Sequence, residues 1–111
     1  MSTDLRTLFA ISAGLSRRFA DGNSPFEIMT RLLEECGELA GEVNHFEGRG
    51  VKREKHGDPD RAHLAKEIQD VLRCAAQLAQ HYGVEAELES SILISYQRLV
   101  SEGWIEPGEG E

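Results

Sequence analysis

Two stretches of this chain combine a helical spacing of apolar residues with closely placed carboxylates, and this feature most restricts its fold. The first contains Glu34-Glu35-Cys36-Gly37-Glu38 and the second contains Glu67-Ile68-Gln69-Asp70. Around both, apolar residues recur every three or four positions, which is the pattern of a helix with one apolar face. Few stretches are rich in β-branched residues. The sequence therefore predicts an all-α fold built around two acid-bearing helices.

Helix signals along the chain predict four helices, at about 3–19, 24–46, 58–82 and 84–102. The segment Ser24-Pro25-Phe26-Glu27 is a capping box with proline at the first helical position. Asp58-Pro59 is expected to cap the third helix, and Gly83 is expected to end it in the left-handed conformation. The segment 47–58 is polar, basic and contains glycine, so we expect a loop there.

The 111 residues are expected to form a single domain over 1–103, followed by a flexible C-terminal tail over 104–111. A domain of this size buries only roughly two-thirds of the surface of its unfolded chain. We therefore expect further stability to come from self-association.

Charge and composition restrict the partners. Acidic residues outnumber basic ones by 20 to 12, giving a net charge of −8, which argues against binding to nucleic acid phosphates. No apolar stretch approaches the roughly 20 residues of a membrane span. The two cysteines lie in predicted helices, and no signal peptide is recognised, so reduced thiols and a cytoplasmic location are expected.

A helical wheel suggests how the two acid clusters are arranged. If the two helices form an antiparallel hairpin with their apolar stripes facing each other, the carboxylates fall on equivalent shoulders. The predicted stripes are Met29, Leu32, Leu33, Cys36, Leu39, Ala40 and Val43 in one helix and Leu64, Ile68, Val71, Leu72, Ala75, Leu78 and Tyr82 in the other. Four carboxylates, those of Glu35, Glu38, Glu67 and Asp70, should then converge on one edge.

Convergent carboxylates repel one another and need a compensating positive charge. Most acidic pairs on helices are simply solvated surface, and each pair taken alone would be read that way. Their convergence favours a metal site, because Mg²⁺ and Mn²⁺ prefer carboxylate oxygen.

The same residues resemble a known family. Leu32-Leu33-Glu34-Glu35-Cys36-Gly37-Glu38-Leu39-Ala40, followed by Glu67-Ile68-Gln69-Asp70-Val71-Leu72, is similar to the E-E-x-x-E, spacer, E-x-x-D signature of MazG-like all-α nucleoside triphosphate pyrophosphohydrolases. These are relatives of the dimeric dUTPases and the phosphoribosyl-ATP pyrophosphohydrolases. The resemblance implies a helical subunit that assembles into a homodimer or homotetramer. It also implies hydrolysis of a nucleotide at its α–β phosphoanhydride with Mg²⁺ or Mn²⁺, and removal of non-canonical nucleotides is a role that would fit this activity.

By position in that signature, the resemblance makes Glu35, Glu38, Glu67 and Asp70 the metal ligands. The resemblance implies that Glu34 either supports the metal ligands without binding the metal or is the base that orients the attacking water. The expected catalytic residues are Glu34 and Glu35. Cations expected to bind the substrate phosphates are Lys52, Arg53, Lys55, Lys66 and Arg98. The family often has a lysine after the second acid helix, where this chain reads Ser95-Tyr96-Gln97-Arg98 and offers Arg98 as the cation.

Two alternatives remain open at this point. Glu42-Val43-Asn44-His45 has the E-x-x-H form of a di-iron carboxylate protein, for which Asp60-Arg61-Ala62-His63 is the available second half. The chain could also be a non-enzymatic helical dimerisation module whose acids serve solubility. In that case Mg²⁺ would leave its thermal stability unchanged, whereas a metal site would raise it.

Overall fold

The computed structural model describes residues 3–48 and 57–110. These ranges contain four α-helices and no strand: α1 (Leu5–Arg18), α2 (Pro25–Phe46), α4 (Arg61–His81) and α5 (Glu85–Ser101). The predicted all-α fold with four helices is thus confirmed. The middle of the predicted loop, including Lys52, Arg53 and Lys55, lies outside the described residues. No helix within the described ranges is long and apolar enough to span a membrane.

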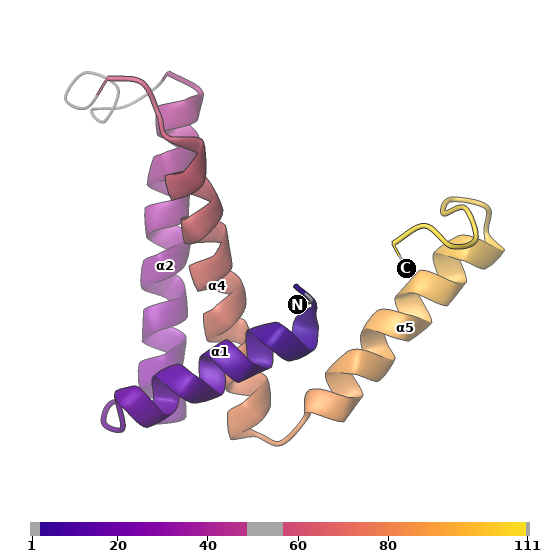
Figure 1. The fold of residues 1–111 in the computed structure, drawn as a ribbon, viewed down its shortest axis with the longest axis horizontal. Helices are drawn as coiled ribbons and strands as arrows, with labels where there is room; N and C mark the ends of the chain where they lie inside the picture. Colours follow the sequence, from indigo (N-terminus) through magenta and orange to yellow (C-terminus); the bar gives the residue numbers. More distant parts are fainter. Residues whose placement is uncertain (1–2, 49–56, 111) are drawn as a thin grey trace.

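Helices α2 and α4 lie side by side as an antiparallel pair at the centre of the fold (Figure 1). Two contacts between them define the register. Arg31, early in α2, bonds Gln77 late in α4, whereas Glu42, late in α2, contacts His63 early in α4. The predicted acid-bearing helix hairpin is therefore confirmed.

The starts of these two helices follow local capping chemistry. The Ser24 hydroxyl accepts the backbone N–H of Glu27 at 3.2 Å, and Pro25 is the first helical residue, as predicted. For α4 the prediction was wrong by two residues. The N-cap is Asp60, whose Oδ1 accepts the Ala62 N–H at 2.9 Å, so the helix begins after Asp58-Pro59.

Gly83 ends α4 in the left-handed conformation, with φ of +65°, as predicted. The Val84 N–H bonds the Ala79 carbonyl at 2.9 Å, and the Gly83 N–H bonds the Gln80 carbonyl at 3.2 Å. This pair of bonds is a Schellman motif, which satisfies carbonyls at the end of the helix. After this turn the chain leaves the central pair, and α5 projects away from it (Figure 1).

Helix α1 crosses the end of the central pair and packs against α4 (Figure 1). Polar contacts fasten it there: the Gln80 side chain donates to the Phe9 carbonyl at 2.9 Å, and Gln77 donates to the Ser16 hydroxyl at 3.1 Å. Among the described residues, the buried apolar ones are few and mostly small, namely Ile28, Cys74, Ala76 and Ala79. A single copy of the chain thus has a small core.

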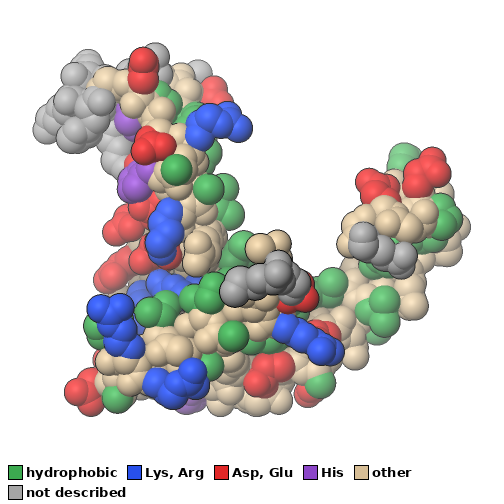
Figure 2. All heavy atoms as spheres, in the orientation of Figure 1, with side chains coloured by type: hydrophobic (Ala, Val, Ile, Leu, Met, Phe, Trp, Pro, Cys, Tyr) green, Lys and Arg blue, Asp and Glu red, His purple; other side chains and the backbone are tan. Residues whose placement is uncertain are grey.

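The prediction that the apolar stripes of the two acid helices face each other is wrong for the single chain. Leu33 is 64% exposed, and Val43, Ile68 and Leu72 are also exposed. Besides the four buried apolar residues named above, the buried side chains of the pair include the polar ones of Glu42, His45, Glu67 and Gln77. In Figure 2 acidic side chains follow one edge of the column formed by α2 and α4, and hydrophobic ones follow the other edge. The polar residues meet between the helices, and the apolar stripes remain available for another surface.

Candidate metal centre

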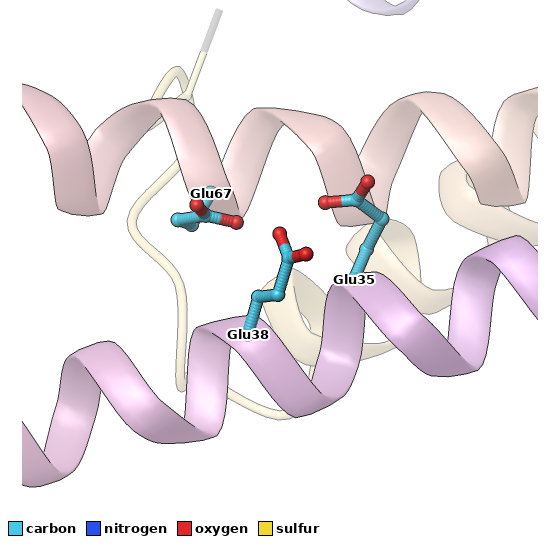
Figure 3. A group of neighbouring side chains, drawn as sticks. All are labelled: Glu35, Glu38 and Glu67. Carbon is cyan, nitrogen blue, oxygen red and sulfur yellow. The ribbon is translucent and has the colours of Figure 1, made fainter.

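Three carboxylates converge between the two central helices. Glu35 and Glu38 lie one turn apart on α2, and Glu67 reaches toward them from α4 (Figure 3). One oxygen from each residue can be chosen so that all three atoms lie within 4.8 Å of one another. Since the side chains come from two packed helices, the backbone holds the oxygens together. Convergence of these three predicted ligands is therefore observed in the structure, although their binding of a metal stays a prediction.

The environment of these carboxylates suits a cation. Glu67 is 8% exposed and Glu35 is half-buried, and within the described residues the Oε2 atom of each is buried without a hydrogen-bond partner. Unpaired buried carboxylate oxygens are costly, and a bound divalent cation would satisfy them. The donor set is oxygen only, which matches hard cations such as Mg²⁺ and Mn²⁺.

The same crowding changes the protonation of the site. Burial raises the pKa of the Glu35 carboxyl, and the neighbouring charges of Asp70 and Glu38 raise it further. Burial also raises the pKa of Glu67, where the next cause is the charge of Glu38. Arg73 acts in the opposite direction on Glu35. The charged forms of both groups therefore need a positive partner.

Asp70, the fourth predicted ligand, is half-buried beside the three glutamates. Its Oδ1 bonds the Lys66 ammonium one turn earlier and lies 3.9 Å from Nη2 of Arg73. Asp70 thus has two cationic neighbours, and its role as a metal ligand stays a prediction. Lys66, predicted to bind phosphate, is exposed and lies at the site through this ion pair.

Two further predicted site residues that the structure describes, Glu34 and Arg98, do not belong to the cluster of three carboxylates. Glu34 is exposed on α2 next to Glu35. Arg98 is in the last turn of α5, which lies apart from the central pair within one chain (Figure 1). The roles of both residues stay predictions.

Sequence reasoning missed the part played by His63. Its Nδ1 lies 3.1 Å from Oε1 of Glu42, which is 2% exposed, and its Nε2 lies 3.4 Å from Oε1 of Glu67. His63 thus bridges the two helices next to the candidate metal centre. The spacing of His63 and Glu67, four residues apart on one helix, was the signal that could have found it.

The di-iron alternative brings two of its expected ligands, Glu42 and His63, into contact, but within the described residues they do not join a cluster of three or more possible metal ligands. Nε2 of a third expected ligand, His45, lies 2.6 Å from the Gly57 carbonyl oxygen. Across residues 3–48 and 57–110, the cluster suited to a metal consists of Glu35, Glu38 and Glu67, with no histidine.

Sequence reasoning also missed a polar pocket beside the carboxylates. A cavity of about 240 Å³ lies between the end of α1, the start of α2 and the middle of α4. Its polar lining includes Arg31, Arg73 and Gln77. Arg73 follows Asp70 by three residues, and this spacing on one helix is the signal that could have located it.

The described residues form an all-α hairpin with three carboxylates close together between its helices. This arrangement is typical of helical proteins that bind a divalent cation through carboxylates. The sequence model of the MazG nucleotide pyrophosphohydrolase domain matches residues 23–92, more than half of the chain. The chain therefore belongs to the MazG nucleotide pyrophosphohydrolase family, a family of hydrolases that act on nucleotides.

A curated relative agrees in length. An uncharacterized protein of Bacillus subtilis (strain 168), YpjD, is 32% identical over 111 residues, covering 96% of this chain and 97% of the relative. No solved structure matches this chain significantly.

Proposed function

We propose that this protein is a Mg²⁺-dependent nucleoside triphosphate pyrophosphohydrolase that cleaves the α–β phosphoanhydride to give a nucleoside monophosphate and pyrophosphate. The observation that carries the proposal is the convergence of Glu35, Glu38 and Glu67 between two rigid helices within the family-matched region. Mn²⁺ is expected to replace Mg²⁺, because both prefer carboxylate oxygen. We place the protein in the cytoplasm and propose that it removes non-canonical nucleotides.

Each residue has a defined task in this proposal. Glu35, Glu38, Glu67 and Asp70 hold the divalent cation, which supplies charge neutralisation on the phosphate oxygens and activation of water. Glu34 and Glu35 are the candidate proton acceptors for the water that attacks the α-phosphorus.

Cations near the acids are proposed to hold the outer phosphates of the substrate. Lys66 forms an ion pair with Asp70. If Asp70 were a metal ligand, the Lys66 ammonium would be able to bind a phosphate instead. We also propose that phosphate is bound by Lys52, Arg53 and Lys55, which lie outside the described residues. Arg98 belongs to α5 and would serve a site in a second copy of the chain in a homodimer or homotetramer.

A nucleotide panel tests the proposal directly. Wild-type protein incubated with Mg²⁺ and canonical or modified triphosphates should release pyrophosphate and monophosphate, and EDTA should abolish the release. The Glu38→Gln variant should lose at least about 100-fold in kcat/KM, because it removes one charged ligand from the cation.

The matched control is Glu87→Gln, which makes the same chemical change at an exposed position of α5 and should retain activity. Absence of turnover with every triphosphate, in folded protein, would contradict the hydrolase proposal. If Mg²⁺ also failed to raise the unfolding temperature, the non-enzymatic dimerisation module would become the better description.

A further inference from the structure

The pocket beside the carboxylates has the size and walls of a site for one planar heterocycle. Its volume is about 240 Å³, below the range of roughly 300–1,000 Å³ that is usual for sites enclosing a whole drug-sized ligand. Leu15 and Phe19 from the end of α1 supply apolar surface, and the polar side chains come from the other elements. Such a pocket can enclose a fragment of a substrate whose remainder lies outside it.

In this pocket, the side-chain amides of Gln77 and Asn23 are already paired with other protein groups. The Gln77 side chain donates to the Ser16 hydroxyl at 3.1 Å and to Oδ1 of Asn23 at 3.0 Å, and its Oε1 accepts from Nη1 of Arg31 at 3.1 Å. Asn23 in turn donates to the Phe19 carbonyl at 2.8 Å. Both side-chain amides are therefore held in fixed orientations, and the oxygen of each already accepts a hydrogen bond from within the protein.

The two arginines have donors to spare. Arg31 uses one N–H on Gln77 and one on the Gly22 carbonyl at 2.6 Å, while a guanidinium carries five. The Arg73 side chain is 14% exposed, and its Nε is buried with no hydrogen-bond partner within the described residues. The acidic neighbour of Arg73, Asp70, has its Oδ1 3.9 Å from Nη2 of Arg73. Both arginines line the pocket, so their guanidinium groups can donate hydrogen bonds to a ligand there.

We propose that this pocket binds the nucleobase, and that Arg73 and Arg31 donate hydrogen bonds to it. The pocket would then select bases that have a carbonyl oxygen over bases that have an amino group at the same ring position. The inference rests on the proposed function, because it places the phosphates at the adjacent carboxylates. An arginine donates to the carbonyl of uracil or hypoxanthine, whereas the amino group of cytosine or adenine presents its own N–H to that arginine.

A phosphate is the other ligand that two arginines suit, and the lining of the pocket favours a base over it. Leu15 and Phe19 contribute apolar surface that a phosphate would not use. The Asn23 and Gln77 amides provide polar edges in fixed orientations, as planar heterocycles require. The proposal therefore treats Arg73 as a specificity residue.

Paired substrates that differ by one group test the proposal. We expect wild-type kcat/KM to favour UTP over CTP and ITP over ATP by at least about 10-fold, since a site that lacks its hydrogen-bond partner discriminates strongly. Arg73→Met keeps an unbranched apolar chain but removes the donors, and should reduce both ratios below about 3-fold, mainly through loss of UTP and ITP. Arg73→Lys should give intermediate ratios. Arg17→Met, an exposed position of α1, is the matched control and should leave both ratios unchanged.

Binding of monophosphates gives a second readout that does not require turnover. The wild-type protein with Mg²⁺ should bind UMP and IMP more tightly than CMP and AMP, and Arg73→Met should remove the difference. If no triphosphate is hydrolysed but this preference is found, the proposed activity fails and the pocket assignment stands. Equal affinities in the wild type would overturn the pocket assignment. An equal loss for all bases in Arg73→Met would also overturn it, since that result indicates a phosphate contact.

Discussion

At the scale of single residues, the carboxylates between α2 and α4 make the metal-free protein sensitive to pH. Glu35 and Glu67 both have raised pKa values in the folded state because of burial and neighbouring acids. A folded-state pKa above the unfolded value means that the folded protein binds more protons between the two values. The contribution of these groups to stability is therefore full below the ordinary carboxyl pKa and is lost as pH rises through the folded-state values.

We expect the unfolding temperature in EDTA to fall as the pH is raised from about 4.5 to 8, and saturating Mg²⁺ to remove most of this fall. Glu67→Gln should flatten the profile in EDTA and weaken the response to Mg²⁺. Glu87→Gln is again the control and should leave the profile as in wild type. Thermal unfolding followed by circular dichroism measures all three, and a wild-type profile in Glu67→Gln would contradict the explanation.

The sequence was sufficient to locate the acids but not their neighbours. Spacings of three and four residues put Glu35 with Glu38, and the hairpin brought Glu67 to them, so their convergence was predictable. The contacts of His63 with Glu42 and the unpaired Nε of Arg73 depend on side-chain conformations and on distances across helices. Helical periodicity contains no information about those quantities.

At the scale of the elements, Gln77 joins three segments of the chain through its single amide. It bonds Ser16 at the end of α1, Asn23 in the connection, and Arg31 on α2, all from a buried position on α4. This side chain thereby determines how the α1–α2 connection lies against the central pair. The pocket beside the metal centre owes its shape to that arrangement.

Gln77→Ala should therefore destabilise the protein by about 2–3 kcal/mol, because it leaves buried polar partners unsatisfied in addition to losing its own bonds. Gln80→Ala is the matched control on the same helix. It removes one bond, to the Phe9 carbonyl, from a half-buried residue and should cost about 1 kcal/mol. Urea unfolding with an unchanged m-value measures the free energy of unfolding of both variants. An equal loss of stability in the two variants would contradict the idea that the Gln77 network contributes more than a single hydrogen bond.

The orientation of the central helices was not predictable from the wheel. A wheel shows that Leu33 and Val43 share a face, but not which surface covers that face. The structure places polar groups between the helices, where His63 can contact Glu42 and a cation can satisfy the glutamates. Hydrophobic pattern alone would assign the apolar faces to the interior of the single chain.

At the scale of the whole molecule, exposed apolar side chains lie on α5 and along one edge of the central pair (Figure 2). On α5, Ile94 is 64% exposed, and Ile92 and Leu93 are also exposed. Contiguous apolar surface of this kind marks an interaction site. We therefore expect a homodimer or homotetramer in which a second copy covers these faces.

Ile94→Glu should shift the protein toward monomer in size-exclusion chromatography with light scattering, because it buries a charge in the proposed interface. Gln97→Glu adds the same charge to the same helix at an exposed, already polar position and should stay assembled. Retention of assembly by Ile94→Glu, or a monomeric wild type at micromolar concentration, would contradict α5 as the assembling element.

The projection of α5 also connects folding of this segment to protein concentration. The helix has 17 residues, contacts α4 near its start and has no buried residue within one chain. In proteins, most of the stability of a helix comes from tertiary packing of its apolar face, and α5 has little of it within one chain. If the expected homo-oligomer forms through α5, the order of this helix depends on protein concentration, and we expect dilution to melt α5 while the hairpin that holds the carboxylates stays folded.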